Sequence, residues 1–187
     1  LLTYPDPMAE TRPGVIEDDR GRLPIHAALA IAASPAVIDL LIQDNPMALV
    51  HTTEESLQAP LHAAFSRPWI APLQSVETVE LVLRTYTADK YGTVVDGRLA
   101  MKMEDAAGSY PLHYACQNKA CVEVVKMLVE KYPMTASLLN SEGDLPLHCL
   151  LEDDVVKAIT RTVADVSKED VLTEKFETTR QKIAALI

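Results

Sequence analysis

One short motif occurs four times in this chain and limits what the chain can fold into. A proline, then leucine or isoleucine, then histidine stand at residues 24–26, 60–62, 111–113 and 146–148. Four of the five histidines lie in these triplets, and they are 36, 51 and 35 residues apart. Such recurrence is typical of repeat proteins, in which one structural unit is copied along the chain.

The single long interval contains two insertions. In the first and third copies, Pro46 and Pro133 follow the triplet histidine after 20 residues. In the second copy, Tyr86 corresponds to Tyr132 but lies about 5 residues farther from its histidine, and about 11 further residues precede the next triplet. The extra residues lie around "SRPWIAPLQ" and within "TADKYGTVVDGRLAMKM". Without them the period is about 35 residues.

Each copy is predicted to form a turn followed by two helices. Proline is favoured at the first position of a helix, so first helices are expected to begin at Pro24, Pro60, Pro111 and Pro146. Small residues follow each triplet and allow neighbouring helices to approach closely. Apolar stripes in "AVIDLLIQDNP" and "VEVVKMLVEKYP" predict second helices, which Pro46 and Pro133 should end.

Three of the turns contain a glycine. Gly21, Gly108 and Gly143 supply the positive φ that such a turn usually requires. A single unit cannot bury its apolar face alone, so neighbouring units are expected to stack. The expected fold class is therefore all-α, a solenoid of stacked helix–turn–helix units with short β-hairpin-like fingers.

The units resemble ankyrin repeats. "DDRGRLPIHAA" from Asp18, "DAAGSYPLHYA" from Asp105 and "NSEGDLPLHCL" from Asn140 match the family pattern Asp-x-x-Gly-x-Thr-Pro-Leu-His-x-Ala in register. The resemblance covers roughly residues 1–160 and implies an ankyrin-repeat solenoid. The threonine before proline is absent from all four units, and Leu57 stands where the second turn should have its glycine. Because a left-handed leucine costs about 1–2 kcal/mol, the second turn is expected to be remodelled.

The expected organisation is an array over residues 1–166 followed by a helix over residues 167–187. The array is divided into a partial unit and four recognisable units at residues 1–17, 18–52, 53–104, 105–139 and 140–166. "LLTYP" at the start resembles the end of a second helix, so we expect a longer parent chain. The last helix is expected to cap the stack, or otherwise to bind a partner or form a coiled coil.

The repeated histidines are interpreted as structural. Helices of stacked units lie about 10 Å apart, which is too far for their histidines to share a metal. The resemblance implies that these histidines bond the backbone of neighbouring loops. Cys116 stands where a small core residue is expected, so we interpret it, with Cys121 and Cys149, as packing rather than as a metal or redox site. No phosphate-binding, nucleophile-elbow or zinc-protease motif is present, and we expect no catalytic, cofactor or metal site.

Composition narrows the range of partners. The 187 residues are 48% hydrophobic and can bury a substantial core. A formal net charge of -10 opposes general nucleic-acid binding and docking on anionic lipid. No apolar run approaches the ~20 residues of a membrane span. Three cysteines without a disulfide-framework spacing predict a reducing intracellular compartment, the cytoplasm first and an organelle as the alternative.

The two insertions carry distinct signals. The first holds the only tryptophan, Trp69, which either covers the core of its own repeat or anchors a partner. The second places Asp96-Gly97 between short apolar stretches, a strong hairpin signal. We expect a β-hairpin over residues 93–101 that enlarges one finger.

The leading functional hypothesis is a non-enzymatic protein–protein interaction module or scaffold. The alternatives are a regulatory or targeting domain of a larger multidomain enzyme, and a structural subunit of a large assembly. The resemblance implies that the partner, another protein, binds the concave face and the fingers, whose acidic tips favour a basic surface. The expected partner-binding residues are Asp19, Arg20, Arg22, Ile31, Glu55, Gln58, Arg67, Trp69, Ser109, Tyr114, Gln117, Asn118, Glu142, Asp144, Glu152 and Asp153.

Overall fold

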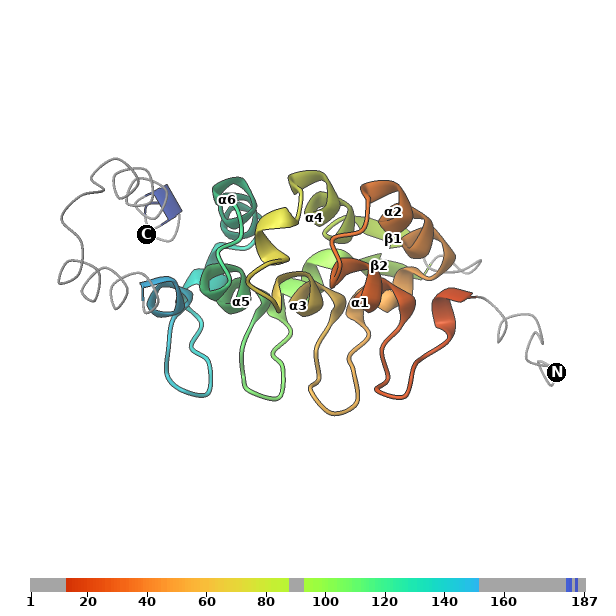
Figure 1. Ribbon diagram of the computed structural model, residues 1–187, viewed down its shortest axis with the longest axis horizontal. Coiled ribbons are helices and arrows are strands. Elements are labelled where there is room, and N and C mark those ends of the chain that lie inside the picture. Colours follow the sequence, from red (N-terminus) through yellow and green to blue (C-terminus); the bar gives the residue numbers. More distant parts are fainter. Residues whose placement is uncertain (1–12, 88–92, 152–180, 183, 185–187) are drawn as a thin grey trace.

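Pairs of short helices stack side by side in the computed structural model, which describes residues 13–87, 93–151, 181, 182 and 184. Figure 1 shows the pairs arranged along the length of the molecule. The first helices are α1 (Pro24–Leu29), α3 (Pro60–Phe65) and α5 (Pro111–Gln117). The second helices are α2 (Pro35–Asp44), α4 (Val76–Val82) and α6 (Val122–Lys131). Residues 146–151 are also helical and begin a fourth unit.

Each helix packs against its counterpart in the next pair. α1 contacts α3 and α3 contacts α5, while α2 contacts α4 and α4 contacts α6. Ala28, Ala64 and Ala115, two positions after each triplet histidine, are buried in one continuous apolar core. The helix-rich stack predicted from the repeated motif is therefore present over the described units.

The triplets begin helices as predicted. Proline is the first residue of α1, α3 and α5, and the preceding residue is extended in each case. No side chain of that preceding residue caps the helix, in keeping with the missing threonine. The triplet histidine instead bonds the residue before the helix. Its Nδ1 accepts the backbone N–H of Leu23, Ala59 or Tyr110 at 3.1–3.2 Å.

Short 3-10 helices lie between the helix pairs and inside one loop. They are η2 (Pro13–Val15), η3 (Pro46–Val50), η4 (Ala71–Leu73), η5 (Gly97–Lys102) and η6 (Pro133–Ser137). α2 and α6 each end two residues before a proline, which then begins η3 or η6, so the predicted helix stops are confirmed.

The second turn only partly follows the prediction of a remodelled loop. It is one residue longer than the first, because Thr53 N–H bonds Gln58 O whereas Asp18 N–H bonds Arg22 O. Leu57 nevertheless has φ +51, so the expectation that this turn would avoid a left-handed leucine is wrong. The surrounding turn bonds hold Leu57 there at a cost of about 1–2 kcal/mol.

A β-hairpin is present in the second insertion, but not where the Asp-Gly signal predicted it. β1 (Thr85–Thr87) pairs antiparallel with β2 (Val94–Asp96), so the connection falls before β2 and not at Asp96-Gly97. Gly97 begins η5 instead, and it packs so closely against Val82 O that a side chain there would collide with this oxygen. Asp96 caps η5 by accepting the N–H of Arg98.

Several predictions fall outside the described residues. The first part of the partial unit, the whole second helix of the fourth unit and most of the expected C-terminal helix are among them. Of that last helix, Lys182 is buried, and Gln181 and Ala184 line a hollow of about 490 Å³ together with Lys126 and Val129 of α6.

Candidate interaction surface

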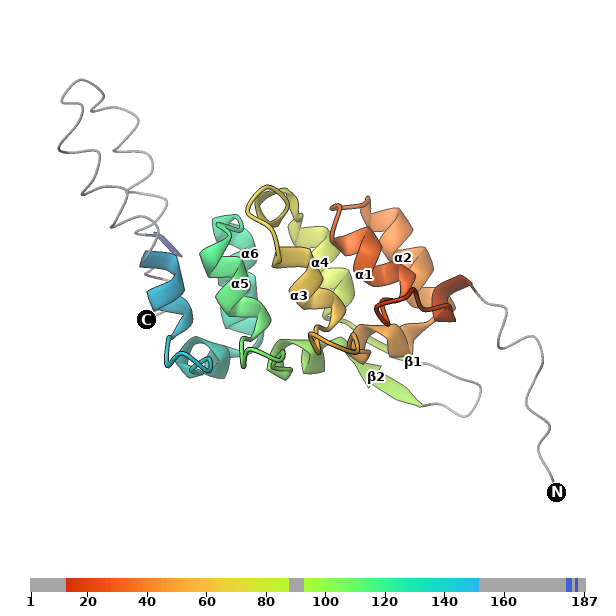
Figure 2. The ribbon, with the colours of Figure 1, turned by 60° about the horizontal axis from the view of Figure 1, so that its bottom comes forward.

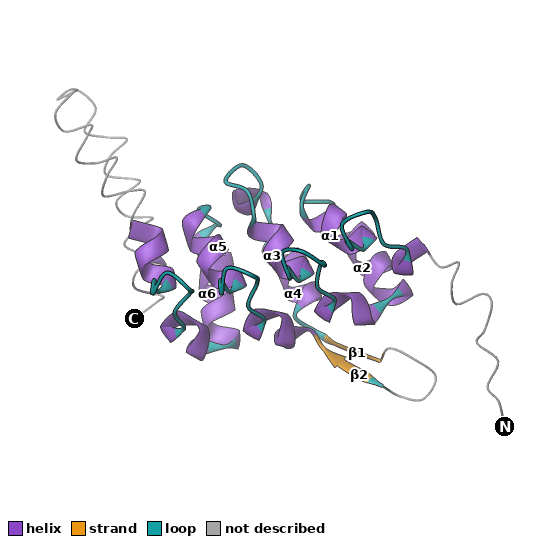
Figure 3. Cartoon of the chain, turned by 90° about the horizontal axis from the view of Figure 1, so that it is seen from below, coloured by secondary structure: helices purple, strands orange, loops and turns teal. Residues whose placement is uncertain are grey.

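Four turns project in a row along one edge of the molecule. This turn row comprises residues 18–22, 53–58, 105–109 and 140–144, each immediately before a first helix. Figure 1 shows the turns extending from the same side of the stack, and Figure 3 shows them from below. The row is the described counterpart of the predicted fingers.

A side-chain oxygen at the first position holds each turn. Asp18 Oδ1 accepts the N–H groups of Arg20 and Arg22 at 3.0 and 2.9 Å. Asp105 Oδ1 and Asn140 Oδ1 accept the corresponding pairs of N–H groups in the third and fourth turns. In the second turn Thr53 Oγ1 accepts the N–H of Gln58 at 3.0 Å. The tips therefore have defined shapes before any partner binds.

Hydrogen bonds also join one turn to the next. The N–H of Ala106 donates to Ser56 O at 2.9 Å, and the N–H of Ser141 donates to Ala107 O at 3.3 Å. The second, third and fourth turns consequently form a connected surface and not a set of independent loops.

The triplet histidines bond each first helix to the following turn. Because Nδ1 accepts a backbone N–H, the proton lies on Nε2, which donates to a carbonyl oxygen of the next unit. His26 donates to Gln58 O, His62 to Ser109 O and His113 to Asp144 O, at 3.2, 3.1 and 3.0 Å. The structural interpretation of these histidines is confirmed for the three whose following turn is described.

Burial keeps these histidines neutral. It lowers the pKa of His26 from 6.5 to about 4, and it also lowers the pKa of His62 and of His113. The bonded carbonyl oxygens oppose this shift but do not outweigh burial. The histidines that hold the units together therefore carry no charge near neutral pH.

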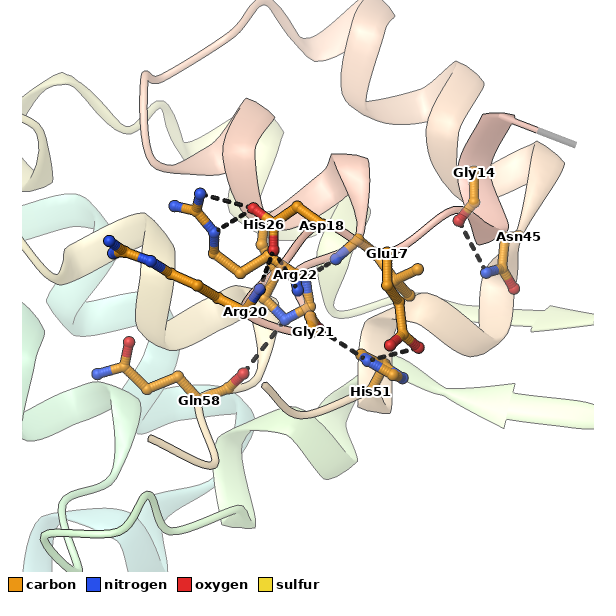
Figure 4. A network of polar contacts seen from close by, with 11 residues as sticks. Gly14, Glu17, Asp18, Arg20, Gly21, Arg22, His26, Asn45, His51 and Gln58 are labelled. Carbon is orange, nitrogen blue, oxygen red and sulfur yellow. Dashed lines mark hydrogen bonds and ion pairs between the residues drawn. The ribbon is translucent and has the colours of Figure 1, made fainter. Parts of the chain in front are cut away.

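Figure 4 shows the N-terminal end of the row, where the fifth histidine adds a link. His51 Nε2 lies 3.1 Å from Gly21 O and 3.4 Å from Glu17 Oε1. Its ring meets that of His26 edge-on, with the centroids 5.9 Å apart. The repeat pattern did not identify His51, because it lies outside the triplets.

Charge is balanced in the first turn. Asp18 forms an ion pair with Arg22 at 2.6 Å, and the hydrogen bond from Arg22 lowers the pKa of Asp18 to about 2. Asp19 and Arg20 are exposed beside this pair. Two acidic and two basic side chains therefore offset one another at this end of the row.

The second and fourth turns are acidic. Glu54 and Glu55 are exposed in the second turn, as is Glu142 in the fourth, beside the partly exposed Asp144. Neither turn contains lysine or arginine. A negative field at these two tips is therefore not offset within the turns themselves.

The predicted partner-binding residues differ in exposure. Those that are exposed are Asp19, Arg20, Arg22, Ile31, Glu55, Arg67, Trp69, Gln117 and Glu142. Those that are partly exposed are Gln58, Ser109, Tyr114 and Asp144. Glu152 and Asp153 lie outside the described residues.

Gln58 and Tyr114 meet around a buried carboxylate. Tyr114 Oη donates to Asp105 Oδ2 at 2.7 Å, and Gln58 Nε2 lies 3.5 Å from both of these oxygens. Burial, together with the bond to Asp105, raises the pKa of Tyr114 to about 12. The hydroxyl is thus already used within the stack, and the part of Tyr114 left for a partner to contact is its ring.

Asn118 is a correction to the predicted site. It is only 9% exposed, and its Nδ2 donates to Phe65 O of the preceding unit at 2.7 Å. The last carbonyl oxygens of a helix have no partner within that helix, and the amide supplies one. Asn118 therefore joins two units and is not placed for partner contact.

Gln74 has the same role one unit earlier. Its Nε2 donates to Leu29 O at 2.6 Å and to Ala64 O at 3.1 Å, and the side chain is buried. Leu29 and Phe65 stand at equivalent positions, three residues after a triplet histidine. Sequence reasoning missed Gln74, because a glutamine inside an insertion has no repeated counterpart.

Ile31 and Trp69 lie away from the turn row. They belong to the loop edge, which we define as the loops joining the two helices of each unit, at residues 30–34, 66–75 and 118–121. In Figure 2 this edge is at the top, opposite β1 and β2. Trp69 is 64% exposed, so the interpretation that it covers the core of its own repeat is wrong.

The described residues contain no group of three potential metal ligands, and none of their helices has the length and apolar character of a transmembrane segment. None of the three cysteines is disulfide-bonded. Burial raises the pKa of the Cys116 thiol to about 12, so Cys116 is a packed, unreactive side chain.

The stacked helix pairs, the projecting turns and the histidine bonds between units define a helix-rich repeat architecture. Within it, residues 107–140 match the family model described as ankyrin repeat. The chain therefore contains an ankyrin repeat, made of the third turn, α5, α6 and η6. Ankyrin repeats are a non-enzymatic fold that binds other proteins. No curated protein shows significant sequence similarity to the chain.

Proposed function

We propose that the chain is a protein–protein interaction module or scaffold, in which all four units are ankyrin repeats stacked into one solenoid. The support is the recurrence, in the first and second units, of features found in the matched third unit. These are the proline start, the bond from Nδ1 to the helix N-terminus and the bond from Nε2 to the next turn.

We place the partner site on the turn row and the adjoining exposed sides of the first helices. The observation that carries this proposal is that the preformed, mutually bonded turns present uncompensated carboxylates at Glu54, Glu55 and Glu142. Such a surface fits a basic partner, and charges at an interface rim act mainly on the association rate.

Apolar contact supplies most of the affinity in this proposal. The partly exposed ring of Tyr114 lies beside the turn row, where Tyr114 Oη bonds Asp105. A fixed aromatic ring loses little entropy on binding, which makes it a suitable anchor.

The test begins with capture of partners by the intact protein and their identification by mass spectrometry. Association rates are then measured at low and high salt for a variant carrying Glu54→Gln, Glu55→Gln and Glu142→Gln. We expect slower association with a flatter salt dependence. The matched control carries Glu77→Gln, Glu80→Gln and Glu123→Gln, which remove three exposed carboxylates from the second helices. Equal behaviour of the two variants would refute the acidic site.

We also propose that the protein works in a reducing intracellular compartment, in the first place the cytoplasm. The three cysteines form no disulfide, and Cys116 and Cys149 are buried, which is compatible with this location. Localisation of the tagged full-length protein in its own cells tests this proposal directly.

A further inference from the structure

The loop edge of the second unit is built differently from that of its neighbours. In the first and third units a short loop closes when the N–H of Ala33 or Ala120 donates to the carbonyl of Ala28 or Ala115, at 2.9 Å in both. In the second unit the loop is longer, and Gln74 Nε2 donates to the equivalent Ala64 O. Stacking does not require the additional residues of this loop, because the loops of the neighbouring units close without them.

This longer loop has a defined shape. The carbonyl of Arg67 accepts the N–H groups of Ile70 and Ala71 at 3.0 and 2.9 Å, and η4 continues the chain. Ala71 and Gln74 are buried, which fixes the second half of the loop to the stack. Two prolines, Pro68 and Pro72, restrict the backbone further.

The loop displays large apolar side chains to solvent. Trp69 is 64% exposed and Leu73 is 65% exposed. Ile31, on the neighbouring loop of the first unit, is 70% exposed. The two loops are joined, because Gln74, next to Leu73, bonds the carbonyl of Leu29. An exposed tryptophan in a loop of defined shape that also carries Leu73 has the properties of a binding anchor.

The charge at this edge is positive. The guanidinium of Arg67 lies 5.7 Å from the centre of the Trp69 ring, so it stacks on the anchor. Among the residues that the structure describes, no carboxylate forms an ion pair with Arg67. A cation on an aromatic ring remains able to pair with an incoming carboxylate.

We propose that Ile31, Arg67, Trp69 and Leu73 form a second binding site, which takes a short protein segment carrying a carboxylate beside leucine or phenylalanine. The carboxylate pairs with Arg67, and the apolar side chain covers Trp69 and Leu73. This site is opposite in charge to the turn row and does not depend on binding there.

Trp69 is itself the reporter, since the chain has a single tryptophan. The full-length protein is titrated with synthetic peptides of about 12 residues in which Glu alternates with Leu or Phe. Matched peptides carry Gln or Lys in place of every Glu. We expect the acidic peptides alone to shift Trp69 emission to shorter wavelength and to protect it from acrylamide, saturably and with weaker binding at high salt.

Charge reversal identifies the contact. Arg67→Glu should weaken binding of the acidic peptides by roughly tenfold and favour the lysine peptides. Arg20→Glu makes the same change on the turn row and should leave the affinity unchanged. Circular dichroism confirms that both variants remain folded.

Three outcomes would overturn the proposal. They are quenching of Trp69 that no acidic peptide reduces, equal binding of the glutamine peptides, and self-association that depends on Trp69, which would make a second copy the occupant. The variant carrying Glu54→Gln, Glu55→Gln and Glu142→Gln should still bind the acidic peptides. Failure of these peptides with continued binding of a basic partner would remove this site and leave the proposed function intact.

Discussion

The second and third units close the loop between their two helices in different ways. The third unit, which matches the ankyrin repeat, closes its loop through a backbone bond from Ala120 to Ala115. The second unit contains two insertions and closes the same loop through the side chain of Gln74. Both keep the histidine bonds to the next turn, through His62 and His113.

This difference distinguishes the bonds between units, which recur along the stack, from the loop length, which varies from unit to unit. Bonds between units recur wherever the structure describes them, whereas loop length varies at the edges that face solvent. We call the bonds of His26, His62 and His113 to the following turn the constant part of the stack. We call the inserted loop at residues 66–75, which contains the exposed Trp69, the variable part. We therefore expect changes in the histidine bonds to alter stability, and changes in the inserted loop to alter binding.

The largest effect expected is a loss of stability at low pH, caused by the buried histidines of the constant part. The pKa of His26 is about 4 in the folded chain, against 6.5 for an unburied histidine, so the unfolded chain binds more protons between these values. Stability is therefore full above about pH 6.5 and falls as the pH drops toward 4, by up to about 3 kcal/mol from His26 alone. His62 and His113 act in the same direction.

Urea unfolding between pH 7 and pH 4.5 measures this loss, and NMR titration of the His26 ring measures its pKa directly. A pKa of His26 near 6.5 in the folded protein would contradict the prediction.

His62→Ala tests the constant part by mutation. It removes the acceptor for Ala59 N–H and the donor to Ser109 O, at the centre of the stack. We expect the free energy of unfolding to fall by about 3 kcal/mol. His148→Ala, at an exposed position, should cost under about 1 kcal/mol. Similar losses in the two variants would show that the bonds between units are not what stabilises the stack.

Gln74→Met tests the side-chain bonds by which Gln74 closes the longer loop of the second unit, in the variable part. Methionine keeps the approximate shape of glutamine but cannot donate to Leu29 O or Ala64 O. A loss of about 2 kcal/mol is expected, with faster amide hydrogen exchange in residues 66–75. Gln117→Met, at an exposed position, is the matched control and should have little effect. An unchanged exchange rate in the loop would argue that Gln74 does not anchor it.

Leu57→Gly is expected to have the smallest effect, and to stabilise. Leu57 has φ +51, is 46% exposed and lies where the other turns have glycine. Glycine removes the steric cost and should raise the free energy of unfolding by about 1 kcal/mol. Leu57→Ala removes the same side chain but keeps Cβ, and it should give no such gain. A less stable glycine variant would mean that Leu57 makes contacts worth more than its strain.

Much of the local structure could be predicted from the sequence. The starts of α1, α3 and α5 follow from proline, which fixes φ and lacks an N–H at a position where none is needed. The left-handed residues of three turns follow from glycine. The exposed tips at Asp19, Glu55 and Glu142 follow from their register in the repeat.

Predictions failed where a contact joins residues that are distant in the sequence. Asn118 was expected on the surface, but it bonds Phe65 O, which is distant in sequence. The hairpin was expected to turn at Asp96-Gly97, but Gly97 instead packs closely against Val82 O. Local propensity contains no information about either contact.

Sequence alone determined the repeating unit of this protein, the starts of its first helices and the structural role of its triplet histidines. The helix starts depend on backbone geometry within a few residues, and the motif recurs often enough to be recognised. The role of the histidines follows from the ankyrin resemblance, because their bonds reach the next unit. Only the tertiary structure decided that Gln74 and Asn118 bond the preceding unit, that β2 pairs with β1, and that Trp69 faces solvent. The bonds of Gln74 and Asn118 depend on which buried carbonyl comes within reach after the units have stacked, and the local sequence does not contain that information.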